Sequence, residues 1–191
     1  MPVFRHAVTL ALSLCAALCA ALCPAPQAMA APPAKTGAPH LAETSFAQLP
    51  QPLPLPYDEQ ADAGAAIRAA TAAAKAHHRL VLIDMGGNWC LDCRLLAATI
   101  ALPDLSPFVR AHYEVVTVDV GRYTKNMDIP ARYGVNRWQG VPMLLIVDPR
   151  TQRLLNAGHT SALADARSLS PQALADWLAR WIDAPPDQRA P

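Results

Sequence analysis

The sequence predicts a single α/β domain built on a mixed sheet, and three observations support this. Two apolar runs, residues 80–85 and 141–147, have the composition of strands that are covered on both faces. Helical patterns lie between and around the predicted strands, so that helices and strands alternate along the chain. With 191 residues, of which 52% are hydrophobic, the chain is long enough for one sizeable core and short for two.

The amino-terminal segment has the composition of a secretory signal peptide. Arg5 supplies a positive charge, residues 7–22 are apolar and rich in Leu and Ala, and Ala28–Met29–Ala30 offers small residues before a cut. A spanning helix is the alternative, but such a helix needs about 20 apolar residues and this apolar core is shorter. We expect a signal peptide of residues 1–30 and export to the periplasm, with an uncleaved membrane anchor as the competing interpretation.

Removal of the signal peptide leaves two cysteines in the mature chain, Cys90 and Cys93. A disulfide across two intervening residues restricts the unfolded chain very little, so its purpose is chemical rather than structural. Export also places the pair where disulfide chemistry is active, such as a bacterial periplasm. This CxxC spacing therefore predicts a redox-active dithiol.

The charge distribution gives no indication of a nucleic-acid partner. The formal net charge is only +1, and the Lys and Arg residues form no run along the chain. The same distribution does not favour an anionic membrane surface. We therefore expect no nucleic acid as a partner and, after the signal peptide is cleaved, no membrane.

Residues 31–56 are rich in proline and contain few large apolar side chains. Because proline lacks a backbone donor, this composition disfavours both helices and sheet pairing. We predict an extended, mobile linker before a folded domain of residues 57–185, and a short carboxy-terminal tail of residues 186–191. The alternative for residues 49–56 is a polyproline ligand for another protein.

The first half of the domain alternates helices and strands. An Ala-rich helix is predicted over residues 58–78, with acids near its start where the helix dipole favours them. The strand of residues 80–85 follows, and then a helix to about Ile100. Ser106–Pro107 opens a short helix, and the β-branched residues of 114–120 predict a second strand.

The second half is predicted to close with a hairpin and a helix. Residues 128–133 predict a short helix that ends at Gly134, where a left-handed conformation is favourable. The strand of residues 141–147 is followed by a turn, and residues 153–156 predict a short strand paired with it. Ser170 and Pro171 begin the last helix, which carries an apolar stripe of Leu174, Trp177, Leu178, Trp181 and Ile182.

Cys90 and Cys93 stand at the junction of the strand of residues 80–85 and the helix that follows. At a helix start, unpaired backbone N–H groups and the positive end of the dipole stabilise a thiolate. Cys90 is therefore the predicted nucleophile, and Cys93, one turn later, is predicted to resolve the mixed disulfide. A zinc site is the alternative for such a pair, but it needs four ligands and the mature chain has no second pair of cysteines. We expect no metal, and no cofactor other than the Cys90–Cys93 disulfide.

Two motifs together resemble the thioredoxin superfamily. Trp89–Cys90–Leu91–Asp92–Cys93 follows an apolar strand, and Gly140–Val141–Pro142 opens a later one. The similarity covers about residues 58–183 and extends to exported thioredoxin-like proteins and to the carboxy-terminal domains of transmembrane thiol-disulfide reductases. The resemblance implies a thioredoxin fold, with a central mixed sheet of about four to five strands and helices on both faces. It also implies two kinds of partner: a protein disulfide substrate and an upstream thiol-disulfide electron donor.

The resemblance gives roles to residues outside the cysteine pair. Asp84 lies in an otherwise apolar strand, where burial raises the pKa of a carboxyl, and it matches the buried acid of thioredoxins that exchanges a proton with Cys93 through a water. A solvated aspartate at the end of the strand is the alternative. Pro142 matches the cis-proline that faces the disulfide, Val141 offers its backbone to an extended substrate, and Trp89 is a candidate contact for the partner protein.

The direction of electron flow depends on Leu91 and Asp92, the two residues between the cysteines. Reduction potentials in the superfamily run from about −270 mV to about −120 mV, which corresponds to ~7 kcal/mol of dithiol stabilisation. An acid beside the thiolate opposes its ionisation and disfavours a strong oxidant. We therefore predict a thiol-disulfide oxidoreductase that acts as a reductant or electron relay. Two alternatives are a copper-binding chaperone that uses the thiol pair and a histidine such as His159, and a non-catalytic interaction domain.

Overall fold

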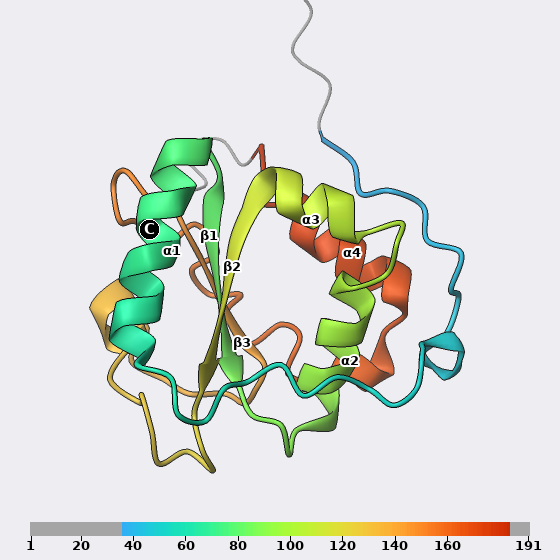
Figure 1. Cartoon of the computed structure of the whole chain (residues 1–191), viewed down its shortest axis with the longest axis horizontal. Coiled ribbons are helices and arrows are strands. Elements are labelled where there is room, and N and C mark those ends of the chain that lie inside the picture. Colours follow the sequence, from blue (N-terminus) through green and yellow to red (C-terminus); the bar gives the residue numbers. More distant parts are fainter. Residues whose placement is uncertain (1–35, 184–191) are drawn as a thin grey trace, which may run out of the picture. The chain divides into compact units, whose positions relative to one another are not determined.

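A sheet of three strands forms the centre of the domain in the computed structural model, which describes residues 36–183. β1 (Leu80–Gly86) lies in the middle, between β2 (Tyr113–Asp119) and β3 (Met143–Val147). β1 pairs with β2 in parallel and with β3 in antiparallel orientation, so the predicted mixed sheet is confirmed. Figure 1 shows the twisted sheet with helices on both of its sides.

The sheet has fewer strands than the four to five that were expected. Residues 153–156 form one isolated bridge to the end of β3 instead of a strand. Asn156 is buried, and its side chain donates to Leu144 O at 2.8 Å and accepts from Ile146 N at 2.9 Å. These side-chain hydrogen bonds occupy β3 backbone groups that a longer fourth strand would have paired with.

Helices cover both faces of the sheet, as predicted. One face carries α1 (Ala63–His77), and the other carries α2 (Leu91–Ile100), α3 (Ser106–His112) and α4 (Pro171–Ala179) (Figure 1). Because strand side chains alternate between the two faces, the core has two parts. Both cysteines pack with the cluster that includes α1 residues, although Cys93 itself lies on α2.

Residues of β1 divide between these two parts of the core. Leu82 packs with the helices α2, α3 and α4, whereas Val81, Ile83 and Met85 pack with α1. All four side chains are buried, which accounts for the nearly continuous apolar run in the sequence. β1 is therefore a rigid base for the residues at its carboxyl end.

Three predicted helices have different bounds. The last one, α4, ends at Ala179, so Trp181 and Ile182 of the predicted apolar stripe follow the helix. α1 begins five residues later than predicted, because Asp62 is its N-cap and accepts a hydrogen bond from Ala65 N at 2.9 Å. The predicted helix of residues 128–133 is a short 3₁₀ helix, η2 (Pro130–Tyr133), which ends at Gly134 with φ of 79°. Two further 3₁₀ helices are η1 (Phe46–Gln48) and η3 (Ala166–Ser168).

Residues 36–56 pack against the domain, which corrects the prediction of a mobile linker for this part of residues 31–56. Leu41 and Leu49 are buried in the core on the side of α2 and α4. Arg94 of α2 donates to the backbone carbonyls of Leu53 and Pro54. Figure 1 shows the segment, blue to teal, running past α4 and α2 toward the start of α1. Proline does prevent regular structure here, but the extended backbone still buries its leucines.

The predicted signal peptide of residues 1–30 and the predicted tail of residues 186–191 lie outside the described residues. Within residues 36–183, no helix combines the length and the apolar character that a bilayer-spanning segment requires. The domain boundaries at residues 57 and 185 stay predictions, although packing now continues to the amino-terminal side of residue 57.

Candidate dithiol active site

The two cysteines lie where β1 passes into α2. Cys90 is the N-cap of α2, and its sulfur accepts a hydrogen bond from Cys93 N at 3.2 Å. This places the sulfur at the positive end of the helix dipole, as the sequence predicted. Cys90 is 6% exposed and Cys93 is fully buried, and both are free thiols in the structure. Attack on an outside disulfide is therefore open to Cys90 and closed to Cys93.

The two glycines before the motif permit the close packing of this turn. A Cβ atom on Gly86 would lie 2.7 Å from Cys93 Sγ and 2.4 Å from Tyr57 Oη. A Cβ atom on Gly87 would lie 2.5 Å from the indole nitrogen of Trp89. All three distances are shorter than side chains tolerate, so only glycine lets these groups approach the backbone.

The pKa values of the two thiols shift in opposite directions. A hydrogen bond from the Cys93 thiol lowers the pKa of Cys90; burial opposes this shift and the Cys93 N–H adds to it. The same interaction with Cys90, together with burial, raises the pKa of the Cys93 thiol far above its usual value. Because the thiolate is the nucleophile, Cys90 is the reactive sulfur and Cys93 is the one that keeps its proton.

Asp84 lies on β1 behind the cysteines and is 2% exposed, so the alternative of a solvated aspartate is wrong. Burial raises the pKa of its carboxyl to about 7, although a hydrogen bond from Tyr57 lowers it in part. A carboxyl that titrates near neutral pH can both accept and return a proton. The structure thus gives Asp84 the environment that its predicted role requires.

Tyr57 is a site residue that the sequence analysis did not identify. Its hydroxyl donates to Asp84 Oδ1 at 2.9 Å, and the side chain is buried. Asn88 holds the Tyr57 backbone, with Tyr57 N donating to Asn88 Oδ1 at 3.1 Å and Asn88 Nδ2 donating to Tyr57 O at 2.8 Å. The only signal in the sequence is that a large aromatic residue ends the Pro-rich stretch.

The second motif lies opposite Cys90, as the resemblance implied. The peptide bond between Val141 and Pro142 is cis, and both residues are buried. The Cys90 thiol donates to Val141 O at 3.5 Å. The structure therefore brings Val141 and Pro142 to the nucleophile, while their contact with a substrate stays a prediction.

Asp92, between the cysteines, is held in an ion pair with Arg167. Asp92 is 3% exposed, and Arg167 Nε lies 3.0 and 3.2 Å from its two carboxylate oxygens. The terminal nitrogen of Arg167 donates as well, and Arg167 N donates to Asp92 Oδ1 at 2.9 Å. Burial raises the pKa of Asp92, but the hydrogen bonds and charge of Arg167 outweigh this and hold it below its usual value.

This ion pair weakens the effect of Asp92 on Cys90. From the sequence, we expect the negative charge of Asp92 to oppose ionisation of Cys90, and that charge does raise the pKa of the thiol. A positive charge from Arg167 stands directly against the acid and reduces its net effect. Arg167 lies 75 residues away in the chain, and no local pattern connects it to the motif.

Aromatic side chains form a rim beside Cys90, defined as Trp89, Tyr123 and Trp138. Trp89 is 40% exposed and packs edge to face on Tyr123, with ring centroids 5.8 Å apart. Tyr123 in turn packs on Trp138 at 6.1 Å, and Arg122 lies over the Trp89 ring. The predicted partner contact Trp89 is thus exposed and held in place by its neighbours.

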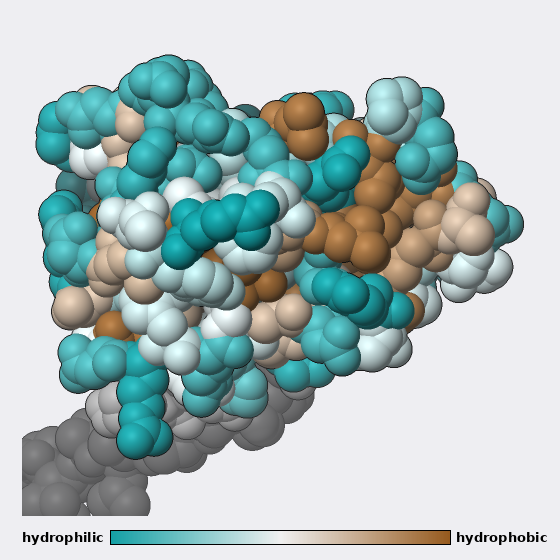
Figure 2. All heavy atoms as spheres, turned by 90° about the horizontal axis from the view of Figure 1, so that it is seen from below, coloured by the Kyte–Doolittle hydropathy of each residue, from teal (hydrophilic) through white to brown (hydrophobic). Residues whose placement is uncertain are grey.

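Apolar side chains are also exposed near the motif. Leu91, the residue after Cys90, is 44% exposed. Figure 2 looks at the domain from below, the side toward which the turn between β1 and α2 points in Figure 1, and apolar atoms gather on one part of this face. Such a patch is typical of a surface that contacts another protein.

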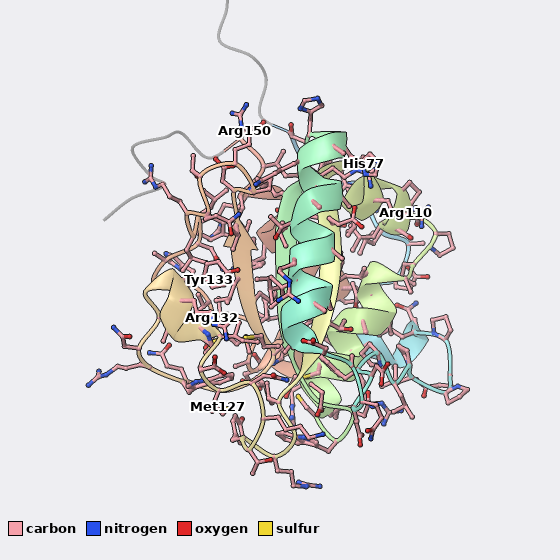
Figure 3. The ribbon with its side chains drawn as sticks, turned by 60° about the vertical axis from the view of Figure 1, so that its left-hand side comes forward. His77, Arg110, Met127, Arg132, Tyr133 and Arg150 are labelled. Atoms are coloured by element: carbon pink, nitrogen blue, oxygen red, sulfur yellow. The ribbon has the colours of Figure 1, made fainter. Side chains whose placement is uncertain are left out.

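Other features of the described residues lie apart from the cysteines. A groove of about 620 Å³ runs between η2 and the segment after β3, lined by Arg132, Tyr133 and Gln152 among others. Figure 3 shows Arg132 and Tyr133 on η2, on the side of α1. Arg132 is paired with Asp128, one helical turn before it. No cysteine lines this groove, so it is separate from the dithiol site.

Residues 36–183 contain no group of three or more His, Cys, Asp and Glu side chains placed to hold a metal ion. His159, the histidine considered for copper, packs its ring against Trp181 with the ring centroids 5.6 Å apart. Copper binding and the absence of a metal both stay predictions.

Comparisons with known proteins match this fold. Residues 62–149 match the family model for thioredoxin-like proteins. A disulphide isomerase from Xylella fastidiosa Temecula1 is 34% identical over 67% of this chain and 97% of that chain, with a TM-score of 0.62. The chain therefore belongs to the thioredoxin-like family. The oxidised carboxy-terminal domain of Neisseria meningitidis DsbD is 24% identical over 47% of this chain and 77% of that chain, with a TM-score of 0.36. A comparison with curated protein sequences gave no match.

Proposed function

We propose that the protein is a thiol-disulfide oxidoreductase that acts on protein disulfides. The main support for the proposal is that the two neighbouring thiols differ in pKa and in burial. Cys90, at the start of α2, has a lowered pKa, and Cys93, fully buried beside it, has a raised pKa. An idle or purely structural pair would not need one reactive and one protected sulfur.

The exchange proceeds in two steps. The Cys90 thiolate attacks one sulfur of the substrate disulfide, which forms a mixed disulfide and releases the other substrate sulfur as a thiolate. Cys93 then gives its proton to Asp84, and the Cys93 thiolate attacks Cys90 Sγ. The bond from Cys90 to the substrate breaks, the substrate leaves as a thiolate that takes up a proton, and a Cys90–Cys93 disulfide remains. Two electrons have passed to the substrate, and an upstream thiol-disulfide donor returns them.

The substrate lies against the loop that contains the cis-proline. Val141 O is 3.5 Å from Cys90 Sγ, so an extended substrate segment that pairs with the Val141 backbone brings its disulfide to the nucleophile. Pro142 follows directly and limits how the segment enters. The exposed Trp89 ring, next to Cys90 in the chain, offers an apolar contact to the same segment.

Electron donation is the proposed direction, as a reductant or electron relay in the periplasm. Asp92 supports it, since its charge raises the pKa of Cys90 and so disfavours a highly stabilised reduced form. Arg167 moderates this effect, which places the expected potential between the extremes of the superfamily. Support for the periplasm comes from the sequence pattern of residues 1–30.

Disulfide isomerisation is a second candidate, favoured by the 34% identity to a protein described as a disulphide isomerase. In an isomerase, a second thiolate of the substrate attacks the substrate sulfur of the mixed disulfide, which forms a new substrate disulfide and releases the Cys90 thiolate. Cys93 is then needed only to free a stalled complex. A Cys93→Ser variant separates the two functions. It keeps activity on a scrambled multi-disulfide protein if the chain is an isomerase and loses activity on a single disulfide if it is a reductant.

Reduction of a protein disulfide in the presence of dithiothreitol tests the proposed function. The mature chain is expected to accelerate the reaction, and Cys90→Ala is expected to return it to the uncatalysed rate. A wild-type rate equal to that of Cys90→Ala would contradict the proposed function. Stoichiometric retention of Cu(I) against a chelator, together with that outcome, would favour the copper-binding alternative.

A further inference from the structure

The Tyr57 hydroxyl stands between the resolving thiol and the buried acid. On one side it donates to Asp84 Oδ1 at 2.9 Å. On the other side it borders Cys93, because a Cβ atom on Gly86 would clash with both Tyr57 Oη and Cys93 Sγ, and the Cys93 side chain hydrogen-bonds with the hydroxyl. Burial raises the pKa of the Tyr57 hydroxyl, and the charges of Asp84 and Cys93 raise it further. Tyr57 therefore keeps a proton at neutral pH, and its hydroxyl can give up this proton only while it accepts another.

The polypeptide before α1 is fixed at several points around this hydroxyl. Asn88 bonds to both the N–H and the carbonyl of Tyr57. Thr117 of β2 donates to Pro56 O at 3.0 Å, and Arg94 of α2 donates to carbonyls of the preceding residues. A segment without regular structure is thus held by three elements of the domain, and the hydroxyl at its end has one defined position.

The surroundings of Asp84 leave few routes for a proton. On the neighbouring strands, Thr117 and Leu144 are paired with it in register, and neither titrates in the physiological range. The Thr117 hydroxyl is committed to Pro56 O. The titratable groups that act with Asp84 are Tyr57, from the segment before α1, and Cys93, from α2.

We propose that Tyr57 relays the proton from Cys93 to Asp84 when the mixed disulfide is resolved. The proposal rests on the function proposed above for the cysteine pair. The Cys93 S–H proton passes to Tyr57 Oη while the Tyr57 O–H proton passes to Asp84 Oδ1. Cys93 Sγ, now a thiolate, bonds to Cys90 Sγ, and the bond from Cys90 to the substrate sulfur breaks. The substrate thiolate takes a proton from solvent, and the relay runs in reverse when the disulfide is reduced again.

Tyr57→Phe tests the relay, because it removes one oxygen and keeps the ring. The reduced chain is mixed with glutathione disulfide, quenched with acid at successive times, and analysed by mass spectrometry for the mixed and the intramolecular disulfide. Formation of the mixed disulfide at Cys90 is expected to stay within about twofold of wild type. Its resolution by Cys93 is expected to slow by about tenfold or more.

The pH dependence of resolution gives a readout that a general loss of stability would not change. Resolution needs an ionised Asp84, and the Tyr57 hydrogen bond lowers the pKa of this carboxyl. Loss of the hydroxyl is therefore expected to move the midpoint of the pH profile upward by about one unit. An unchanged rate of resolution with an unchanged midpoint would overturn the relay.

Tyr113→Phe is the matched control. The Tyr113 hydroxyl is also buried and donates to Leu178 O at 2.7 Å, in a different core cluster from the cysteines and at the end of the sheet where Tyr113 pairs with Leu80. Its removal costs a buried hydrogen bond of the same kind but is expected to leave resolution and its pH midpoint unchanged. If Tyr113→Phe shifts the midpoint as Tyr57→Phe does, general destabilisation is the cause and the relay is overturned.

A measurement on the wild-type chain does not depend on any variant. Two protons move together in the relay, so the rate of resolution in mixtures of H₂O and D₂O is expected to fall along a curve that bows below a straight line. A straight line would indicate one proton and overturn the relay. A wild-type chain that forms no mixed disulfide at all would overturn the proposed function as well, whereas a reactive wild type with a normal Tyr57→Phe overturns the relay alone.

Discussion

Two aspartates of the active site are buried to the same extent and have opposite properties. Asp84 is 2% exposed and Asp92 is 3% exposed. Burial raises the pKa of Asp84 to about 7, and its partner is the neutral hydroxyl of Tyr57. Asp92 has the cation of Arg167, and its pKa lies below the usual range. Burial alone therefore does not decide the chemistry of a carboxyl, and the charge of its partner does.

This difference assigns different work to the two acids. A carboxyl that titrates near neutral pH can take the proton of Cys93 and give it back. A carboxyl that stays ionised cannot, and instead contributes a constant charge, balanced by Arg167, next to the nucleophile. Asp84 is thus assigned to proton transfer with Cys93, and Asp92 to adjusting the reduction potential of the cysteine pair. Four measurements on variants of the site would test these assignments.

The largest expected effect is on stability, in Asp84→Asn. The pKa of Asp84 is about 7 in the folded chain and 3.8 as its ordinary value, so the folded state binds the extra proton between these pH values. Stability from this group is therefore present below about pH 4 and is lost as the pH rises toward 7. The variant is expected to be more stable than wild type by about 4 kcal/mol at pH 8, and by nearly nothing at pH 4, in urea unfolding. Equal stabilisation at both pH values would show that Asp84 is not titrating.

The same Asp84→Asn substitution is next expected to slow resolution of the mixed disulfide by about 100-fold at pH 7. Its amide cannot accept the Cys93 proton, while Cys90 keeps its place at the start of α2. Acid-quench mass spectrometry with glutathione disulfide checks this, with alkylation of Cys90 as the control for the first step. Normal resolution would remove Asp84 from the proton path.

Arg167→Gln tests the other half of the comparison. It leaves the Asp92 charge without its cation, so the pKa of Cys90 rises and the dithiol becomes more reducing, on the order of 30 mV. Thiol trapping in glutathione buffers measures the potential. Asp92→Asn together with Arg167→Gln is the control, and it is expected to lie close to wild type because both charges are gone. An unchanged potential in the single variant would mean that the ion pair is only structural.

The smallest expected effect is at the rim. Trp89→Ala is expected to raise KM for a protein disulfide by about threefold to tenfold, because an exposed aromatic contact is lost. Exchange with glutathione disulfide, which is too small to reach the rim, serves as the control and is expected to be nearly unchanged. Equal losses with both substrates would show that Trp89 acts on the motif itself, through its packing on Gly87.

Local sequence patterns predicted most of the fold and the centre of the site. The apolar runs predicted β1 and β3, and the resemblance to thioredoxins implied that Asp84 and Pro142 would lie near Cys90 and Cys93. These features depend on residues close together in the chain or on a shared family pattern. The prediction of a fourth strand was wrong because the side chain of Asn156 forms hydrogen bonds with backbone groups of β3. The alternation of apolar and polar residues gives no sign that a side chain will replace a strand in this way.

Two contributors to the site were beyond reach of the sequence. Tyr57 ends a proline-rich stretch whose composition indicates only the absence of helix and strand. The position of Tyr57 in the site depends on hydrogen bonds to Asn88, 31 residues later. Arg167 pairs with Asp92 across 75 residues. In both cases a long-range polar contact, which leaves no periodic trace, decides the chemistry of a residue that the sequence did identify.

The most direct test of the account is alkylation of the reduced chain by iodoacetamide across a range of pH, with the modified cysteine identified by mass spectrometry. We predict that Cys90 alone reacts in the folded chain, with a midpoint below the ordinary thiol value of about 8.5. Reaction of Cys93 at a similar rate, or a Cys90 midpoint at or above the ordinary value, would contradict the assignment of a reactive Cys90 and a protected Cys93.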